Sequence, residues 1–303
     1  MNKFKKQKRK KTRADVAVFG STPNKKLGRA VAQEIGVPFG ELRMLHFPDG
    51  ELCVRFMKPV CDRTVVLIHS IHPLPQDAFC ELLFACIGAR QQGAKKVIAV
   101  IPYLGFMRQD KMFHAGEVVS SRAMGVLLAA VADKVITIDP HLHRHKSLNE
   151  VFPIPSLRLS ATKTISQHIE KHWKKAIIVG PDGESDQWAA EVARLAHCQV
   201  LVVKKKRYTA SKVRTKVKDI GFKGKTVIIV DDIISTGHTM QEVAKQVWTA
   251  GARAIVCIGV HGVFAKGALS RLECTGARVM TTDTIRNPVS SISVAKLIAG
   301  ALH

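Results

Sequence analysis

Four strand-like segments of this chain occur twice, in the same order along the sequence. The first copies are VAVFG at 16–20, RTVVLIHS at 63–70, GAKKVIAVIP at 93–102 and DKVITID at 133–139. The second copies are KAIIVG at 175–180, KTVIIVDD at 225–232, GARAIVCIGV at 251–260 and ARVMTTD at 277–283, about 140 to 160 residues further along. Helical patterns separate the apolar runs as in βαβ units, so the repeat predicts two tandem α/β domains, each a mainly parallel sheet flanked by helices.

The domain boundaries are predicted from this repeat and from the charge of the N-terminus. Residues 1–13 carry eight Lys and Arg, no acidic residue and no apolar periodicity, a composition that favours a disordered basic arm. We expect the first domain over residues 14–150 and the second over 151–303, with the seam near 145–158. The length of 303 residues suits two domains of roughly 100–150 residues each.

Charge and cysteine content narrow the classes of function. The net charge is +23, of which about +15 lies outside the arm, so the chain should attract polyanions: nucleic acid, a membrane surface or phosphorylated small substrates. We expect weak nucleic-acid association of the arm alone. Seven cysteines without a C-x-x-C pair favour reduced thiols and a cytoplasmic location. No apolar run is long enough to span a bilayer, so no membrane association is expected.

The segment VIIVDDIISTGHTM at 227–240 carries the strongest chemical signal. Asp231 and Asp232 end a buried strand, and a helical pattern then opens with Ser235, Thr236, Gly237, His238 and Thr239. Ligands of open α/β sheets bind at the carboxyl ends of strands, and the N–H groups of a helix N-terminus can cradle a phosphate. Adjacent buried acids are costly without partners, which favours hydrogen bonds from vicinal sugar hydroxyls. The alternative is a helix cap beside two exposed acids.

This segment is similar to the phosphoribosyl pyrophosphate fingerprint of type I phosphoribosyltransferases and ribose-phosphate pyrophosphokinases. FPDGE at 47–51 and IPYLGFMRQD at 101–110 look like signatures of the pyrophosphokinase family. Further matches at 139–141, 181–182 and 205–207 follow in order, and Ser235 resembles the archaeal-type branch. The resemblance implies two Rossmann-like type I phosphoribosyltransferase-type domains that transfer pyrophosphate from MgATP to the C1 hydroxyl of ribose 5-phosphate.

The residues of these signatures suggest an ATP site. Phe47 can stack on an adenine ring while Asp49 or Glu51 accepts a hydrogen bond from its amino group, although a surface β-turn would explain the same residues. Arg108 can hold phosphate oxygens in a fork, and a solvated helix start is its alternative. The resemblance adds Gln109 and Asp110 to this site.

The resemblance also implies that His141 lies near ATP and helps to hold Mg²⁺. Asp182, in the loop GPDGES, offers a hard oxygen of the kind that Mg²⁺ prefers, and a simple turn acid is its alternative. His143 and His145 alternate with His141 but lack the partner ligands of a zinc site, so both stay unassigned.

Two cations on a polar segment match the family's Lys-x-Arg pair. The resemblance implies that Lys205 and Arg207 lie on a mobile catalytic loop, where they would stabilise developing phosphate charge. A solvated cationic loop is the alternative. His238 stands where the family frequently has Gly, which leaves the sugar-phosphate preference open.

Two other functions remain open: a phosphoribosyltransferase that acts on a base, and a regulatory homologue without turnover. The resemblance further implies a dimer-based homo-oligomer in which the turn at 47–51 reaches a neighbouring chain's adenine. The sequence agrees with shared sites, because the first repeat has Ile68-His69-Ser70 where the second has Val230-Asp231-Asp232.

Overall fold

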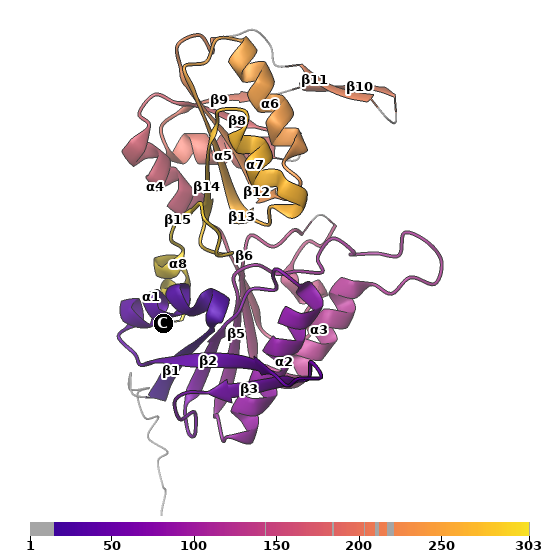
Figure 1. Ribbon diagram of the computed structural model, residues 1–303, viewed down its shortest axis with the longest axis vertical. Coiled ribbons are helices and arrows are strands. Elements are labelled where there is room, and N and C mark those ends of the chain that lie inside the picture. The colour runs from indigo at the N-terminus through magenta and orange to yellow at the C-terminus, as the bar shows by residue number, and fades with distance from the viewer. Residues whose placement is uncertain are drawn as a thin grey trace, which may run out of the picture.

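The computed structural model describes residues 15–142, 144–183, 185–202, 204–209, 212–216 and 221–302. Within these ranges the chain forms two α/β domains, which lie one above the other in Figure 1. Each domain is built on one mainly parallel sheet with helices on both faces, so the predicted fold class is confirmed. No helix among the described residues has the length and apolar character that a membrane span requires. The arm expected at 1–13 lies outside these ranges.

The first sheet has seven strands. In spatial order they are β3 (Leu52–Phe56), β2 (Phe39–His46), β1 (Val16–Ser21), β4 (Thr64–Ile68), β5 (Lys96–Ile101), β6 (Lys134–Ile138) and β7 (Ser156–Leu159). Only the β2–β3 edge pair is antiparallel. The helices of this part of the chain are η2 (Thr22–Asn24), α1 (Lys25–Ile35), α2 (Pro75–Gln91), α3 (Ser120–Val131) and η3 (Leu148–Glu150).

The second sheet has six strands, all parallel. In spatial order they are β15 (Ser290–Ile292), β14 (Arg278–Thr282), β13 (Ala254–Gly262), β12 (Thr226–Ile234), β8 (Ile177–Gly180) and β9 (Gln199–Val202). Its part of the chain contains α4 (Thr162–His172), α5 (Asp186–Leu195), α6 (His238–Thr249), η4 (Ala265–Gly267), α7 (Ala268–Glu273) and α8 (Ala295–Gly300). A separate hairpin of β10 (Lys204–Thr209) and β11 (Lys212–Lys216) extends away from this sheet in Figure 1.

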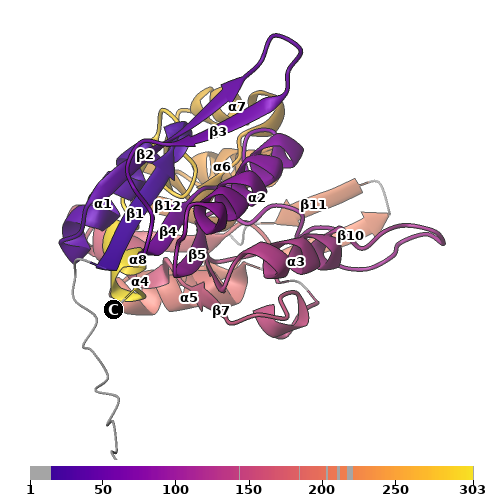
Figure 2. The same ribbon diagram turned by 90° about the horizontal axis from the view of Figure 1, so that it is seen from below.

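The strand orders confirm the sequence repeat. The order β2-β1-β4-β5-β6-β7 in the first sheet corresponds to β9-β8-β12-β13-β14-β15 in the second. All four predicted pairs of segments therefore occupy matching positions. Side chains alternate between the two faces of a strand, so in β1 Val18 packs with α1, whereas Ala17 and Phe19 pack with α2 and α3. Figure 2 shows α2 and α3 side by side on the face away from α1 and α8.

The boundary between the sheets differs from the expected one at residue 150. β7 pairs in parallel with β6, from Val135 opposite Ser156 to Ile138 opposite Leu159, so the chain leaves the first sheet only after Leu159. The second part of the chain also returns to the first domain, because α8 packs against α1. A domain boundary at residue 150 would therefore assign β7 to the second domain, although its backbone hydrogen bonds join it to the first sheet.

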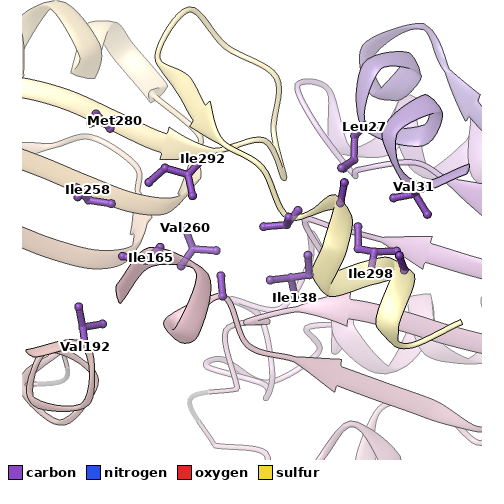
Figure 3. Packing of buried hydrophobic residues seen from close by; sticks show 14 of the residues in the cluster. Leu27, Val31, Ile138, Ile165, Val192, Ile258, Val260, Met280, Ile292 and Ile298 are labelled. Carbon is purple, nitrogen blue, oxygen red and sulfur yellow. The ribbon is translucent and has the colours of Figure 1, made fainter. Parts of the chain in front are cut away.

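The two domains exchange their last helices. β7 of the first sheet leads into α4, which packs against α5 of the second domain, and β15 of the second sheet leads into α8, which packs against α1. One apolar cluster therefore runs through both domains (Figure 3), from Leu27 of α1 through Ile298 of α8 to Ile165 of α4 and Val192 of α5. Burial of this shared cluster fixes how the two sheets face each other.

The same polar contact precedes both exchanged helices. Asp139, at the end of β6, accepts a hydrogen bond from the backbone N–H of Ala161 at 2.7 Å, just before α4. Asp283, at the end of β14, accepts one from the N–H of Val294 at 2.8 Å, just before α8. Burial raises the pKa of both carboxyl groups. The repeat therefore extends to the caps of the exchanged helices.

We predict that Ile298→Ala lowers the free energy of unfolding by about 2–5 kcal/mol, because the substitution leaves a cavity in the shared cluster. Ile298 is fully buried there. Urea denaturation of the variant measures the change. Lys296→Ala, at an exposed position of the same helix, is the matched control and should change stability little. Equal small losses in both variants would contradict the packing of α8 on α1.

Candidate active site

The carboxyl ends of strands from both sheets meet at a pocket of about 680 Å³. The first domain contributes the basic side chains of Arg108, His141 and Arg158, and the second contributes the carboxylates of Asp182, Asp231 and Asp232. Open α/β sheets bind ligands at this edge. The structure therefore brings together five residues predicted from the sequence (Arg108, His141, Asp182, Asp231 and Asp232) and one that was not predicted, Arg158.

The surroundings of Asp231 and Asp232, at the end of β12, shift the pKa values of the two carboxyl groups in opposite directions. Burial, followed by the negative charges of Asp232 and Asp182, raises the pKa of Asp231 well above its ordinary value. Burial is also the largest single influence on Asp232 and acts in the same direction, but the hydrogen bond and charge of His141, together with His261 and the backbone N–H of Ile233, lower the pKa of Asp232 overall. Nδ1 of His141 lies 3.4 Å from Oδ2 of Asp232. The pocket therefore holds carboxyl groups that can accept hydrogen bonds from sugar hydroxyls or bind a cation.

The predicted phosphate loop lies directly beyond this pair, between β12 and α6. Gly237 has a φ of 72°, which a side chain would strain. A Cβ at this position would also lie 3.4 Å from side-chain atoms of Ala268 and Leu272. Arg271 of α7 stabilises this loop, because its Nε donates a hydrogen bond to the carbonyl of Thr236 at 3.3 Å. Thr236 and His238 are exposed, so a phosphate can reach the loop.

Of the predicted triplet at 108–110, only Arg108 lines the pocket. The Asp110 carboxylate is buried and accepts hydrogen bonds from Nη1 of Arg144 at 2.8 and 3.1 Å. Gln109 accepts hydrogen bonds from the backbone N–H and the hydroxyl of Ser120 at the start of α3. In this structure Gln109 and Asp110 hold the loop that presents Arg108.

The predicted adenine turn does not line this pocket. Phe47, Asp49 and Glu51 belong to the turn between β2 and β3, which is closed by a hydrogen bond from the N–H of Phe47 to the carbonyl of Glu51 at 2.9 Å. The Phe47 side chain is 55% exposed. Glu51 instead lines a second pocket, between this turn and α2. Within a single chain the turn is therefore separate from the pocket of Asp231 and Asp232.

Several predicted residues fall wholly or partly outside the described structure. Lys205 and Arg207 belong to β10, where their backbones pair with Thr215 and Val213, but their side chains lie outside the described part, as does all of His143. A hairpin therefore stands where the sequence suggested a loop. His145 is described, and its Nδ1 lies 3.2 Å from Oε2 of Glu150. Among the described residues no three His, Cys, Asp or Glu side chains are grouped to hold a metal ion.

Sequence analysis missed Arg158 and His261, and it gave Asp139, which belongs to the matched segment at 139–141, no role of its own. Arg158 lies on β7, with Nη2 3.9 Å from Oδ1 of Asp139. Asp139 itself has a φ of 35°, a strained value for a residue with a side chain. His261 is buried in β13, and its Nε2 lies 3.1 Å from the carbonyl oxygen of Ile138 and 3.2 Å from that of Asp139. The available signal for His261 was its place directly after the strand segment at 251–260, at the edge where ligands bind.

The fold defines a two-domain protein of the phosphoribosyltransferase type, with a pocket between the domains. A family model for the N-terminal domain of ribose phosphate pyrophosphokinase matches residues 16–131, and one for the phosphoribosyl transferase domain matches 147–296. The ribose-phosphate pyrophosphokinases of Methanopyrus kandleri and Methanothermobacter thermautotrophicus are 33% and 35% identical to the chain. Each alignment covers 94% of this chain, with 98% and 99% of those proteins.

A solved structure gives the same result. The crystal structure of phosphoribosylpyrophosphate synthetase from Mycobacterium smegmatis superposes with a TM-score of 0.80 at 28% identity, over 95% of this chain and 97% of that one. The chain belongs to the ribose-phosphate pyrophosphokinase family. Both relatives named above are archaeal, in agreement with the resemblance to the archaeal-type branch.

We predict that His261 makes stability fall with acidity. Burial lowers its pKa from 6.5 to about 4, so between these values the unfolded chain binds a proton that the folded chain does not. The stabilisation is complete above about pH 6.5 and is lost as the pH falls towards 4, by up to about 3 kcal/mol. Urea denaturation at several pH values should show a flatter dependence for His261→Gln than for the parent. Parallel curves would contradict a buried neutral imidazole.

Proposed function

We propose that this chain transfers the pyrophosphoryl group of MgATP to the C1 hydroxyl of ribose 5-phosphate, giving phosphoribosyl pyrophosphate and AMP. One observation carries the proposal: a carboxylate pair beside a phosphate loop faces Arg108 and His141 of the other domain across one pocket. Relatives that are called ribose-phosphate pyrophosphokinases match the chain over nearly their whole length. The name of these relatives therefore agrees with the proposal that one side of the pocket binds a sugar phosphate and the other side a polyphosphate.

Ribose 5-phosphate would bind on the side of the second domain. Asp231 and Asp232 would accept hydrogen bonds from two neighbouring ribose hydroxyls, which suits adjacent acids in a partly buried position. The 5-phosphate would bind in the loop of Ser235, Thr236, Gly237, His238 and Thr239, at the N-terminus of α6. This placement directs the C1 hydroxyl towards the residues of the first domain.

ATP would bind on the side of the first domain. Arg108 and Arg158 lie in the same pocket, and their guanidinium groups can hold phosphate oxygens in a fork. Phe47, Asp49 and Glu51 are proposed to bind adenine, and Gln109 and Asp110 to support Arg108. The C1 oxygen then attacks the β-phosphorus and loses its proton to solvent, the bond from this phosphorus to the α-phosphate oxygen breaks, and AMP leaves. Such a transfer depends on position and charge neutralisation more than on a strong base.

Magnesium is the proposed cofactor, and the pocket suits it. Mg²⁺ keeps several waters and binds through one or two carboxylates together with substrate phosphates, so the absence of a three-residue cluster among the described residues is consistent with it. His141 and Asp182 would hold the ion, which supplies neutralisation of the phosphate charge. Lys205 and Arg207 on β10 are proposed as the catalytic cations that stabilise charge in the transition state.

We also propose a dimer-based homo-oligomer with shared sites. The turn at 47–51 does not line its own chain's main pocket, and its exposed aromatic residue is available to a second chain. Apolar side chains on α2 and α3 are also exposed: Phe84 at 46%, Leu127 at 50% and Val126 at 63%. Apolar surface of this kind marks interfaces. The seven unpaired cysteines support a cytoplasmic location, and the arm at 1–13 is proposed to add weak nucleic-acid association.

We predict that the purified protein forms AMP from MgATP only when ribose 5-phosphate is present, and without a nucleobase. Chromatography of the nucleotides measures the reaction. Asp232→Asn should lower turnover by about 10²-fold or more, because it removes charge at the reacting sugar, whereas Asn in place of the exposed Asp62 should not. Ribosylation of a base with ATP left intact would favour a phosphoribosyltransferase. Ligand binding without turnover would indicate a regulatory homologue.

We predict that two inactive variants restore activity when mixed. Phe47→Ala chains keep the ribose side and Asp231→Ala chains keep the adenine turn, so mixed dimers contain one complete shared site. Random exchange should recover about a quarter of the parent activity. AMP formation after subunit exchange, verified by differently tagged chains, measures the recovery. No recovery despite exchange would mean that each chain builds its site alone.

A further inference from the structure

His261 joins the two domains through a contact with Asp139, a residue that lines the pocket. It lies on β13 of the second sheet with 1% exposure. Its Nε2 faces two carbonyl oxygens at the end of β6 in the first sheet, those of Ile138 and Asp139. Carbonyls only accept, so Nε2 must carry the proton and donate. Nδ1 lies 2.9 Å from Oγ1 of Thr284 and can accept from that hydroxyl.

These contacts close a ring around the proposed site. Asp139 is followed by Pro140 and His141, and Nδ1 of His141 lies 3.4 Å from Oδ2 of Asp232. The residue after Asp232, Ile233, stands opposite His261 in the pairing of β12 with β13. A series of contacts therefore runs from His261 on β13 through the turn at 139–141 (the β6 turn) to Asp232 on β12. β12 and β13 are neighbouring strands.

The β6 turn needs an external support. Asp139 has a φ of 35°, a conformation that costs free energy unless the surroundings enforce it. Its side chain is already occupied by the N–H of Ala161 at 2.7 Å. The hydrogen bond from His261 reaches the backbone carbonyl of Asp139 itself from the second domain, whereas Asp232 contacts the side chain of His141.

We infer that His261 is a positioning residue for the proposed transfer: it holds the Asp139–His141 turn of the first domain in register with the carboxylates at the end of β12. The inference rests on the proposed function. His261 does not line the pocket, so it acts through the turn and not on the substrates. Its loss should therefore affect turnover more than ribose 5-phosphate binding, which is proposed to depend on Asp231, Asp232 and the loop at 235–239, all of the second domain.

Two substitutions of His261 test the hydrogen bond from Nε2 separately from the contact of Nδ1. The amide nitrogen of Gln extends about as far as Nε2 of His and can still donate to the β6 carbonyls. The amide of Asn reaches only the position of Nδ1, near Thr284. We expect His261→Asn to lower kcat by about 10- to 100-fold, the range found when supports of active-site ligands are removed. His261→Gln should stay within about threefold of the parent, and KM for ribose 5-phosphate should change little in both.

A matched control tests whether any cross-domain contact would have the same effect. Nε2 of His72 lies 3.3 Å from the carbonyl oxygen of Val263 in the other domain, a residue that does not belong to the β6 turn. His72→Leu should keep the parent kcat. Equal losses in the Asn and Gln variants, or a loss in His72→Leu as large as in His261→Asn, would overturn the inference.

A measurement on the unmodified protein covers the case in which the variants fail to fold. Nitrogen-15 NMR of the imidazole groups should show His261 as the neutral tautomer with the proton on Nε2. A proton on Nδ1 would overturn the inference, because Nε2 could not donate. If the parent forms no AMP, the proposed function fails, while the tautomer still reports on the contact itself.

Discussion

The apolar cluster shared by the two domains is the interaction on which the rest of the structure depends. α4 and α8 each leave their own sheet and pack on the other domain, and Ile165 and Ile298 are completely buried there. Each such side chain contributes roughly 1.5–3 kcal/mol when removed from water, whereas a hydrogen bond between the domains contributes about 1 kcal/mol. Apolar burial therefore sets the orientation of the two sheets, and polar contacts such as that of His261 adjust the site within it.

The duplication also explains how one site arises from two similar halves. In the first copy, Ser70 stands where the second has Asp232, and it donates a hydrogen bond to the carbonyl of Thr284 in the other domain. Tyr103 stands where the second copy has His261, and the two rings lie 5.0 Å apart. The end of β4 in the first copy thus contacts the other domain, while the corresponding end of β12 in the second copy lines the pocket. This division is consistent with a single pocket that needs both halves.

The sequence predicted the parts of the structure that depend on long apolar runs and on local motifs. The strands at 16–20 and 225–232 and the residues Asp231 and Asp232 were found because burial and paired acids are visible in one segment. β7 was missed because Ser156–Leu159 is short and half polar, and its place in the first sheet depends on a distant partner strand. The pairing of Asp110 with Arg144 was hidden for the same reason: it joins residues far apart in the sequence. The helix exchange likewise has no local signature.

The central claim is that the protein transfers the β- and γ-phosphates of ATP to the sugar as one pyrophosphoryl group, in a site formed by β12 and the β6 turn. Phosphorus-31 NMR of the protein with MgATP and ribose 5-phosphate tests this most directly. The β and γ signals of ATP should disappear together and reappear as two coupled signals of a pyrophosphate ester on the sugar, with an equal amount of AMP. Formation of ADP with a sugar bisphosphate, or of free pyrophosphate with an unchanged sugar, would contradict the account.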